Sequence, residues 1–141
     1  MDSDINLHSA NQKLTEVFAP WVQQLEIKVT SIDNNEVELL MPFNDSLCRS
    51  GGIVCGQSLM SLIDTAMVFV CYLGMGNYGD CATVSQHTTF MRPVKGADTV
   101  ARGKLIKAGR TLIFGEVTLS TADDPRPVCN GQLTYAVINR K

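Results

Sequence analysis

The sequence has few of the groups from which metal and redox centres are built. It contains 2 histidines among 141 residues, His8 and His87, and neither has a second ligand at zinc-binding spacing. Its 5 cysteines include no C-x-x-C pair, and this odd number favours reduced thiols in a cytoplasmic protein over a framework of disulfides. We therefore expect no metal, no cofactor and a cytoplasmic location.

The sequence also has no large excess of positive or of negative charge. Lysine and arginine number 12 against 14 acidic residues, so the net charge of −2 gives no support for a nucleic acid or an anionic membrane as partner. The first residues, MDSDINLHSANQK, lack the apolar stretch of a signal peptide. The longest apolar run, Leu59 to Leu73, is interrupted by polar residues and is shorter than the roughly 18 residues of a membrane span. We expect a soluble protein.

Apolar residues, in contrast, are plentiful. They make up 45% of the chain, against 18% charged residues, which is more apolar surface than one small domain needs to bury. The length fits one domain spanning residues 1–141. An interface between identical subunits would cover the surplus, so we expect a homodimer or a dimer of dimers, that is, a homotetramer.

The order of patterns along the chain predicts an α+β fold. A short helix is expected over Asn11 to Gln24, with Leu14, Val17, Phe18 and Trp21 on its buried face, where it would cap an open end of the sheet. A hairpin, a loop and one long helix follow, and then four strands separated by turn residues. The expected strands are Leu25 to Ser31, Glu36 to Met41, Cys81 to Met91, Asp98 to Ala108, Thr111 to Thr121 and Val128 to Asn139, with a loop over Pro42 to Val54 and another over Ala122 to Pro127.

The long helix, from about Gln57 to Leu73, is apolar on nearly every side, which is typical of a helix wrapped by a sheet. Its single charged residue is Asp64, and a carboxylate in such surroundings is costly unless it is paired, hydrated or neutralised. Gln57, Ser61 and Asp64 share one polar stripe because they are spaced at i, i+4 and i+7. Glycines at 51, 52 and 56 precede the helix, where unpaired N–H groups and the helix dipole favour an anion or an oxyanion.

Two segments identify a family resemblance. The signature of hotdog-fold acyl-CoA thioesterases, in particular the branch of the phenylacetate-degradation and 4-hydroxybenzoyl-CoA thioesterases, is similar to the segment GGIVCGQSLMSLIDTA. The strand pair of that family is similar to the later segment VSQHTTFMRPVKGADTVARGKLIKAGRTLIFGEV. The resemblance covers nearly the whole chain. It implies a hotdog fold, with a curved antiparallel sheet around the central helix, and the hydrolysis of an acyl-CoA at sites shared by two subunits.

The resemblance implies a mechanism that the spacing allows only between subunits. The Gly56 N–H would polarise the thioester carbonyl, Asp64 would act as base or nucleophile, and Thr83, which matches a hydroxyl residue of the family, would orient water. Gly56 and Asp64 are eight residues apart, or about 12 Å along one helix, so they cannot contact one carbonyl together. Two antiparallel helices around a two-fold axis would bring them together.

The family pattern also suggests substrate-binding residues, some of them at departures from it. Cys55 stands where the motif commonly has His, Gln57 replaces its second Gly, and Arg49 occupies the place of an Asn or Gln near the thioester carbonyl. Ser61 lies on the stripe of Asp64. Positive charge for the phosphates of CoA is available from Arg92, Lys107 and Arg110.

Other interpretations stay open at this point. Asp64 can be a structural residue, hydrogen-bonded to Ser61 or to a turn, and Cys55 can be a nucleophile in place of a packed thiol. The chain can be an acyl-CoA binding module without turnover, as the loss of the motif His would allow. A dehydratase on the same fold would need a His with an acid, for which His87 is the candidate.

Overall fold

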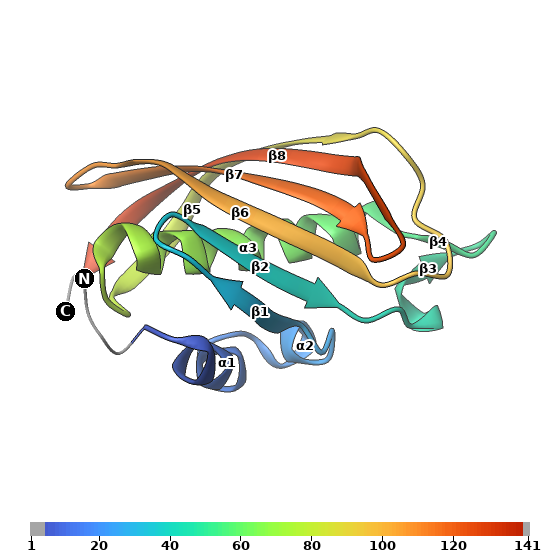
Figure 1. Ribbon diagram of the computed structural model, residues 1–141, viewed down its shortest axis with the longest axis horizontal. Coiled ribbons are helices and arrows are strands. Elements are labelled where there is room, and N and C mark those ends of the chain that lie inside the picture. Colours follow the sequence, from blue (N-terminus) through green and yellow to red (C-terminus); the bar gives the residue numbers. More distant parts are fainter. Residues whose placement is uncertain (1–4, 140–141) are drawn as a thin grey trace.

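The protein, described by a computed structural model for residues 5–139, is built around a curved six-stranded antiparallel sheet and a long helix that lies along its concave face (Figure 1). The strand order is β1-β2-β6-β7-β8-β5, so β1 and β5 are the two edges. This confirms the predicted α+β hotdog architecture. The elements are α1 (Leu7–Glu16), α2 (Pro20–Gln23), β1 (Lys28–Ile32), β2 (Glu36–Met41), the 3-10 turn η1 (Asp45–Leu47), β3 (Cys48–Arg49), β4 (Ile53–Val54), α3 (Gly56–Met75), β5 (Asp80–Phe90), β6 (Thr99–Ala108), β7 (Leu112–Thr121) and β8 (Asp124–Asn139). Two short strands, β3 and β4, form a separate two-stranded sheet.

The central helix α3 is longer than the sequence pattern predicts. It has 20 residues and ends where Gly76 adopts a left-handed conformation (φ 74°) and donates its N–H to the carbonyl of Tyr72. By length and composition alone α3 could cross a membrane. The argument from the sequence that its apolar run is too short for a membrane span was therefore wrong. However, 72% of the most apolar 18-residue segment of α3 is buried inside the fold, as is typical of the core helix of a soluble protein fold.

Three glycines let the sheet approach α3 closely. Gly103, Gly115 and Gly131 lie on β6, β7 and β8 and face the helix. A Cβ at Gly103 would lie 2.7 Å from Cγ2 of Val70, and one at Gly131 would lie 2.8 Å from Cγ2 of Ile63. The central strands therefore form a shallow trough without side chains, in which the apolar residues of α3 are seated.

The N-terminal segment differs from the single helix that the sequence predicts. It forms two helices because Pro20 begins a second one, and the residues buried in α1 are Ala10 and Leu14. Trp21, which was predicted to be buried, is 58% exposed. The predicted capping of the sheet takes a specific form, since the amide of Asn11 exchanges two hydrogen bonds of 3.0 Å with the backbone of Val29 on the edge strand β1.

The last strand begins earlier than predicted. β8 starts at Asp124 and includes Pro125 and Pro127, which the sequence placed in a loop. Strand β5 pairs with β8 only as far as Cys129, so the prolines lie in a stretch that has β7 on one side alone. Proline is tolerated in such a stretch because its missing N–H breaks no ladder hydrogen bond there.

The glycine trough makes a stability prediction. Gly103→Ala should lower the free energy of unfolding by about 1–3 kcal/mol, because its Cβ would be wedged between Val70 and Val37, two stiff β-branched side chains. Urea denaturation measures the change. Gly115→Ala is the matched comparison and should cost less, because the two shortest contacts of its Cβ are to the flexible end of Met67 and Cγ1 of Val70 is 3.2 Å away. Equal losses in the two variants would contradict this explanation.

Candidate active site

Asp64 is half-buried on α3 and is held by two hydroxyl groups from neighbouring strands. Tyr135 of β8 donates to Oδ1 of Asp64 at 2.6 Å and to its backbone carbonyl at 3.0 Å. Thr83 of β5 donates to the same Oδ1 at 3.0 Å. Within residues 5–139, Oδ2 receives only the longer contact of 3.4 Å from Thr83. The carboxylate is thus fixed in direction, with one oxygen occupied and the other available.

Tyr135 is suited to remain a donor to this carboxylate. Its side chain is 2% exposed, and burial together with the nearby charge and hydrogen bond of Asp64 raises the pKa of its phenol well above the usual value. The phenol therefore keeps its proton across the physiological range. A buried tyrosine that donates to a carboxylate satisfies both polar groups and offsets the cost of placing Asp64 in an apolar helix.

A cavity of about 280 Å³ lies in front of Asp64. Its walls are mostly apolar, with few polar groups besides the carboxylate, which is typical of a ligand pocket. Aromatic side chains from α2 and from the segment before it form one wall. The lining residues are Phe18, Trp21, Val22, Met60, Ser61, Asp64, Thr65, Val68 and Gln86.

A second cavity, of about 360 Å³, lies at the N-terminus of α3. Gly56 is the first residue of the helix, and within residues 5–139 its N–H has no hydrogen-bond acceptor. Arg49 and Arg92 line the same cavity, together with Phe90. A helix N-terminus in a cavity that two arginines line is a favourable place for anionic groups.

Cys55 is the N-cap residue of α3, and its thiol lies 3.1 Å from the hydroxyl of Ser58. Burial alone would raise the pKa of this thiol, but the hydrogen bonds of Ser58 and the backbone amides at the helix start outweigh it and lower the pKa. The residue is therefore more acidic than the inert packed thiol that the sequence favoured. Its contacts lie at the Gly56 end of the helix, away from Asp64.

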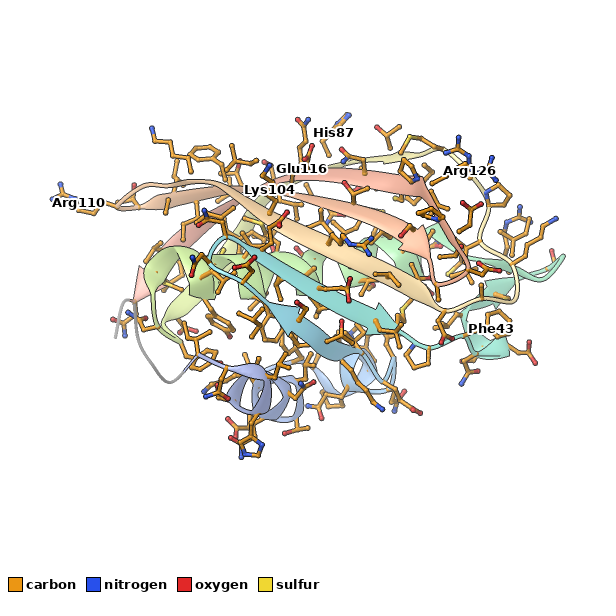
Figure 2. The ribbon with its side chains drawn as sticks, in the orientation of Figure 1. Phe43, His87, Lys104, Arg110, Glu116 and Arg126 are labelled. Carbon is orange, nitrogen blue, oxygen red and sulfur yellow. The ribbon has the colours of Figure 1, made fainter. Side chains whose placement is uncertain are left out.

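The structure brings some predicted site residues together and separates others. Thr83 contacts Asp64 directly, and Ser61 lines the Asp64 cavity. Ser61 donates to the carbonyl of Gln57 at 2.8 Å, so it is not the partner of Asp64 that a purely structural interpretation proposed. Gln57 is exposed. Arg110 lies in the β6–β7 turn, at the opposite end of the molecule from the Gly56 cavity, and does not join it within one chain (Figure 2).

Sequence reasoning missed Tyr135, Trp21 and Gln86. Tyr135 had a weak signal, because a tyrosine at a buried strand position needs a partner for its hydroxyl. Trp21 was assigned to a buried face by helical periodicity, and only the break at Pro20 turns it to the cavity. Gln86 follows a bulge between Thr83 and Ser85, which shifts the alternation of β5 and cannot be read from the sequence.

A third cavity, of about 450 Å³, lies on the convex side of the sheet and is lined by His87 and Glu116 among others (Figure 2). It contains neither Asp64 nor Gly56. His87 is exposed there. No group of three or more potential metal ligands occurs among residues 5–139.

Known proteins support the identification of this fold. The chain is similar to the protein named "Putative esterase Ta0293" of Thermoplasma acidophilum, with 24% identity over 89% of this chain and 96% of that protein. Among solved structures, the thioesterase HI1161 of Haemophilus influenzae matches with a TM-score of 0.85 at 22% identity, over 96% of this chain and 92% of that one. The E. coli PaaI protein from the phenylacetic acid degradation operon matches with a TM-score of 0.79 at 18% identity, over 94% and 95%.

The family assignment comes from the sequence model of the Thioesterase superfamily, which matches residues 51–128, more than half of the chain. The match includes Gly56, Asp64 and Thr83. Membership supports the hydrolysis of thioesters or esters as the general class of reaction. The chain belongs to the Thioesterase superfamily and has its hotdog fold.

Proposed function

We propose that the protein hydrolyses an acyl-CoA thioester at sites that two identical subunits complete together, with no cofactor besides the CoA of the substrate. The main observation is that Asp64 and the Gly56 N–H line two different cavities of the same chain. They are about 12 Å apart along α3, so each cavity contains only one of the two groups that the proposed reaction needs. A second copy would supply the other group.

The exposed stripe of α3 fits such a pairing. Two antiparallel copies of the helix that place Gly56 opposite Asp64 also place Met60 at the two-fold axis, midway between them. Met60 is 40% exposed, although it belongs to a helix that is otherwise mostly buried. Burial of this methionine against its own copy would remove exposed apolar surface from water.

The edge strand β5 offers a second contact for the same pairing. It has 11 residues, has a neighbouring strand on one side only and exposes 58% of Val84. A long exposed edge strand with apolar residues is normally covered in the native assembly. Because β5 also carries Thr83, this edge lies next to Asp64.

In the proposed reaction, the thioester carbonyl oxygen accepts a hydrogen bond from the Gly56 N–H, where the helix dipole stabilises the developing negative charge. Asp64 of the other subunit, oriented by Tyr135 and Thr83, attacks the carbonyl carbon or takes a proton from a water that attacks it. The C–S bond then breaks, and CoA leaves as a thiolate. Where Asp64 itself attacks, water then hydrolyses the resulting acyl anhydride, which releases the acid and restores the carboxylate. No strong general acid is needed, because a thiolate is a good leaving group.

The two cavities have different properties, which suggests where each part of the substrate binds. Arg49 and Arg92 at the Gly56 cavity suit the phosphates of CoA. The mostly apolar walls of the Asp64 cavity suit the acyl group. Arg110, which the sequence also suggested for the phosphates, lies at the opposite end of the molecule from the Gly56 cavity of its own chain, so it would have to reach the phosphates from the other subunit (Figure 2).

Asp64→Asn should reduce kcat for acyl-CoA hydrolysis by about 100-fold or more, because the amide can neither accept the proton nor attack. Cys55→Ser is the matched control and should retain most of the rate. The release of free CoA thiol from a panel of acyl-CoAs measures both variants. Full activity in Asp64→Asn together with loss in Cys55→Ser would instead make the thiol the nucleophile, since its pKa is already lowered.

A mixing experiment tests the shared site. Gly56→Pro removes the N–H donor, and proline suits the first helical position, so α3 should persist. Gly56→Pro and Asp64→Asn should each be nearly inactive as homodimers. Co-expressed at equal levels, they should regain about one quarter of the wild-type rate, because half of the dimers are mixed and each of these has one intact site. A site within one chain would give no recovery.

The acyl cavity makes a specificity prediction. Trp21→Ala should raise KM for bulky or aromatic acyl-CoAs about tenfold, because it removes an apolar wall, and should leave acetyl-CoA nearly unchanged. Trp21→Phe, which keeps an aromatic ring, is the control. Steady-state kinetics with acyl groups of increasing size measures the effect. An equal change for every acyl group would place Trp21 outside the acyl pocket.

The same assays distinguish a non-catalytic acyl-CoA binding module on this fold. Such a module would bind acyl-CoA, as measured by calorimetry, without releasing CoA. Release of free thiol that depends on Asp64 would exclude it.

A further inference from the structure

The cavity in front of Asp64 contains a polar group that the proposed reaction does not use. Thr65 lines this cavity and is only 4% exposed. A threonine inside a helix often donates its hydroxyl to the carbonyl four residues earlier, but the hydroxyl of Thr65 has no hydrogen-bond partner within residues 5–139. A buried hydroxyl without a partner costs free energy of folding. This hydroxyl is therefore suited to a ligand rather than to the fold.

The hydroxyl of Thr65 opens into the cavity and not into the core. Among the residues that the structure describes, no side-chain oxygen or nitrogen is both fully buried and without a hydrogen bond. The hydroxyl oxygen therefore belongs to the small part of Thr65 that is exposed, and the cavity borders this residue. A group that enters the cavity can reach the hydroxyl.

The cavity has a second available donor, on β5. Gln86 accepts a hydrogen bond of 2.8 Å at its Oε1 from the hydroxyl of Thr88, which fixes the direction of the amide. Within residues 5–139 the NH2 group of Gln86 has no acceptor. Ser61, the other hydroxyl of the cavity, already donates its proton to Gln57. The cavity thus offers hydrogen bonds from Thr65 and Gln86 to an oxygen of the ligand.

We propose that the acyl group of the substrate carries a hydroxyl or oxo oxygen on its second or third carbon, counted from the thioester carbonyl, and that Thr65 binds this oxygen. Thr65 directly follows Asp64 in α3, so their Cα atoms are about 3.8 Å apart. Their side chains point about 100° apart around the helix, and both line the same cavity. The hydroxyl of Thr65 is therefore close to the carbonyl carbon on which Asp64 acts, and an oxygen far along the acyl group would be out of its reach.

This arrangement would select among acyl groups without taking part in the reaction. An acyl group that lacks the oxygen would leave Thr65 and Gln86 without partners in a closed site. Such a site discriminates against the analogue, because its buried polar groups are then unpaired. We expect kcat/KM to be about tenfold higher, or more, for an oxygenated acyl group than for its unsubstituted counterpart. This expectation rests on the proposed function.

Hydrolysis of matched acyl-CoAs tests the proposal. Butanoyl-CoA is compared with 2-hydroxybutanoyl-CoA, 3-hydroxybutanoyl-CoA and 3-oxobutanoyl-CoA, which share its carbon chain, and the release of free CoA thiol is measured. The wild-type protein should prefer at least one of the oxygenated substrates about tenfold or more. Thr65→Val keeps the shape of the side chain without the hydroxyl, so it should reduce this preference to near one. Thr65→Ser keeps a hydroxyl and should retain the preference.

The stability of the same variant distinguishes a ligand-binding hydroxyl from a structural one. Because the hydroxyl has no partner within residues 5–139, Thr65→Val should leave the midpoint of urea denaturation unchanged or raise it. Thr83→Val is the matched comparison and should lower the midpoint, since the hydroxyl of Thr83 donates to Asp64. A clear fall in Thr65→Val would show that its hydroxyl is bonded within the folded assembly and would overturn the proposal.

The outcomes separate this proposal from the proposed function. Equal kcat/KM for butanoyl-CoA and the oxygenated substrates, with hydrolysis that still depends on Asp64, would overturn the role of Thr65 alone. If the wild-type protein hydrolyses none of them, calorimetry compares the binding of the same acyl-CoAs. Tighter binding of an oxygenated acyl-CoA that Thr65→Val abolishes would support the role of Thr65 and contradict the proposed function alone. Equal binding would overturn both.

Discussion

The close approach of α3 to the sheet is the constraint on which the rest of the structure depends. Gly103, Gly115 and Gly131 remove side chains where Val70, Met67 and Ile63 of the helix are seated. The helix is then buried on most of its surface, and the part left accessible is a stripe that includes Met60 and Asp64. The packing that stabilises the fold therefore determines which polar residues of α3 can contact a ligand.

This burial also explains why Asp64 needs neighbours on two strands. A carboxylate on an apolar helix lacks hydration on its inner side, and the hydroxyl groups of Tyr135 and Thr83 replace that hydration. Because both donors act on Oδ1, the carboxylate is oriented as well as stabilised. The same arrangement thus serves the stability of the protein and, in the proposed reaction, the positioning of the reactive oxygen.

The sequence predicted most strands well because period-two patterns and turn residues are local. The six-stranded antiparallel sheet, the hairpin around Asp33 and the central helix follow from them. The failures have tertiary causes. Pro125 and Pro127 enter β8 because β5 ends before it reaches them, and Trp21 is exposed because Pro20 starts a new helix. The length of α3 was underestimated because Gly74 is a weak helix former that packing against β6 and β7 retains.

The sequence by itself determined that a lone acid lies in an apolar helix with glycines at its start, and that one helix cannot bring Gly56 and Asp64 to one carbonyl. These facts depend only on residue types and on the fixed rise of a helix. The tertiary structure alone decided that Tyr135, 71 residues from Asp64 in the chain, donates to its carboxylate. It also separated Arg110 from the Gly56 cavity, because distances between distant segments are set by sheet register and by packing rather than by local pattern.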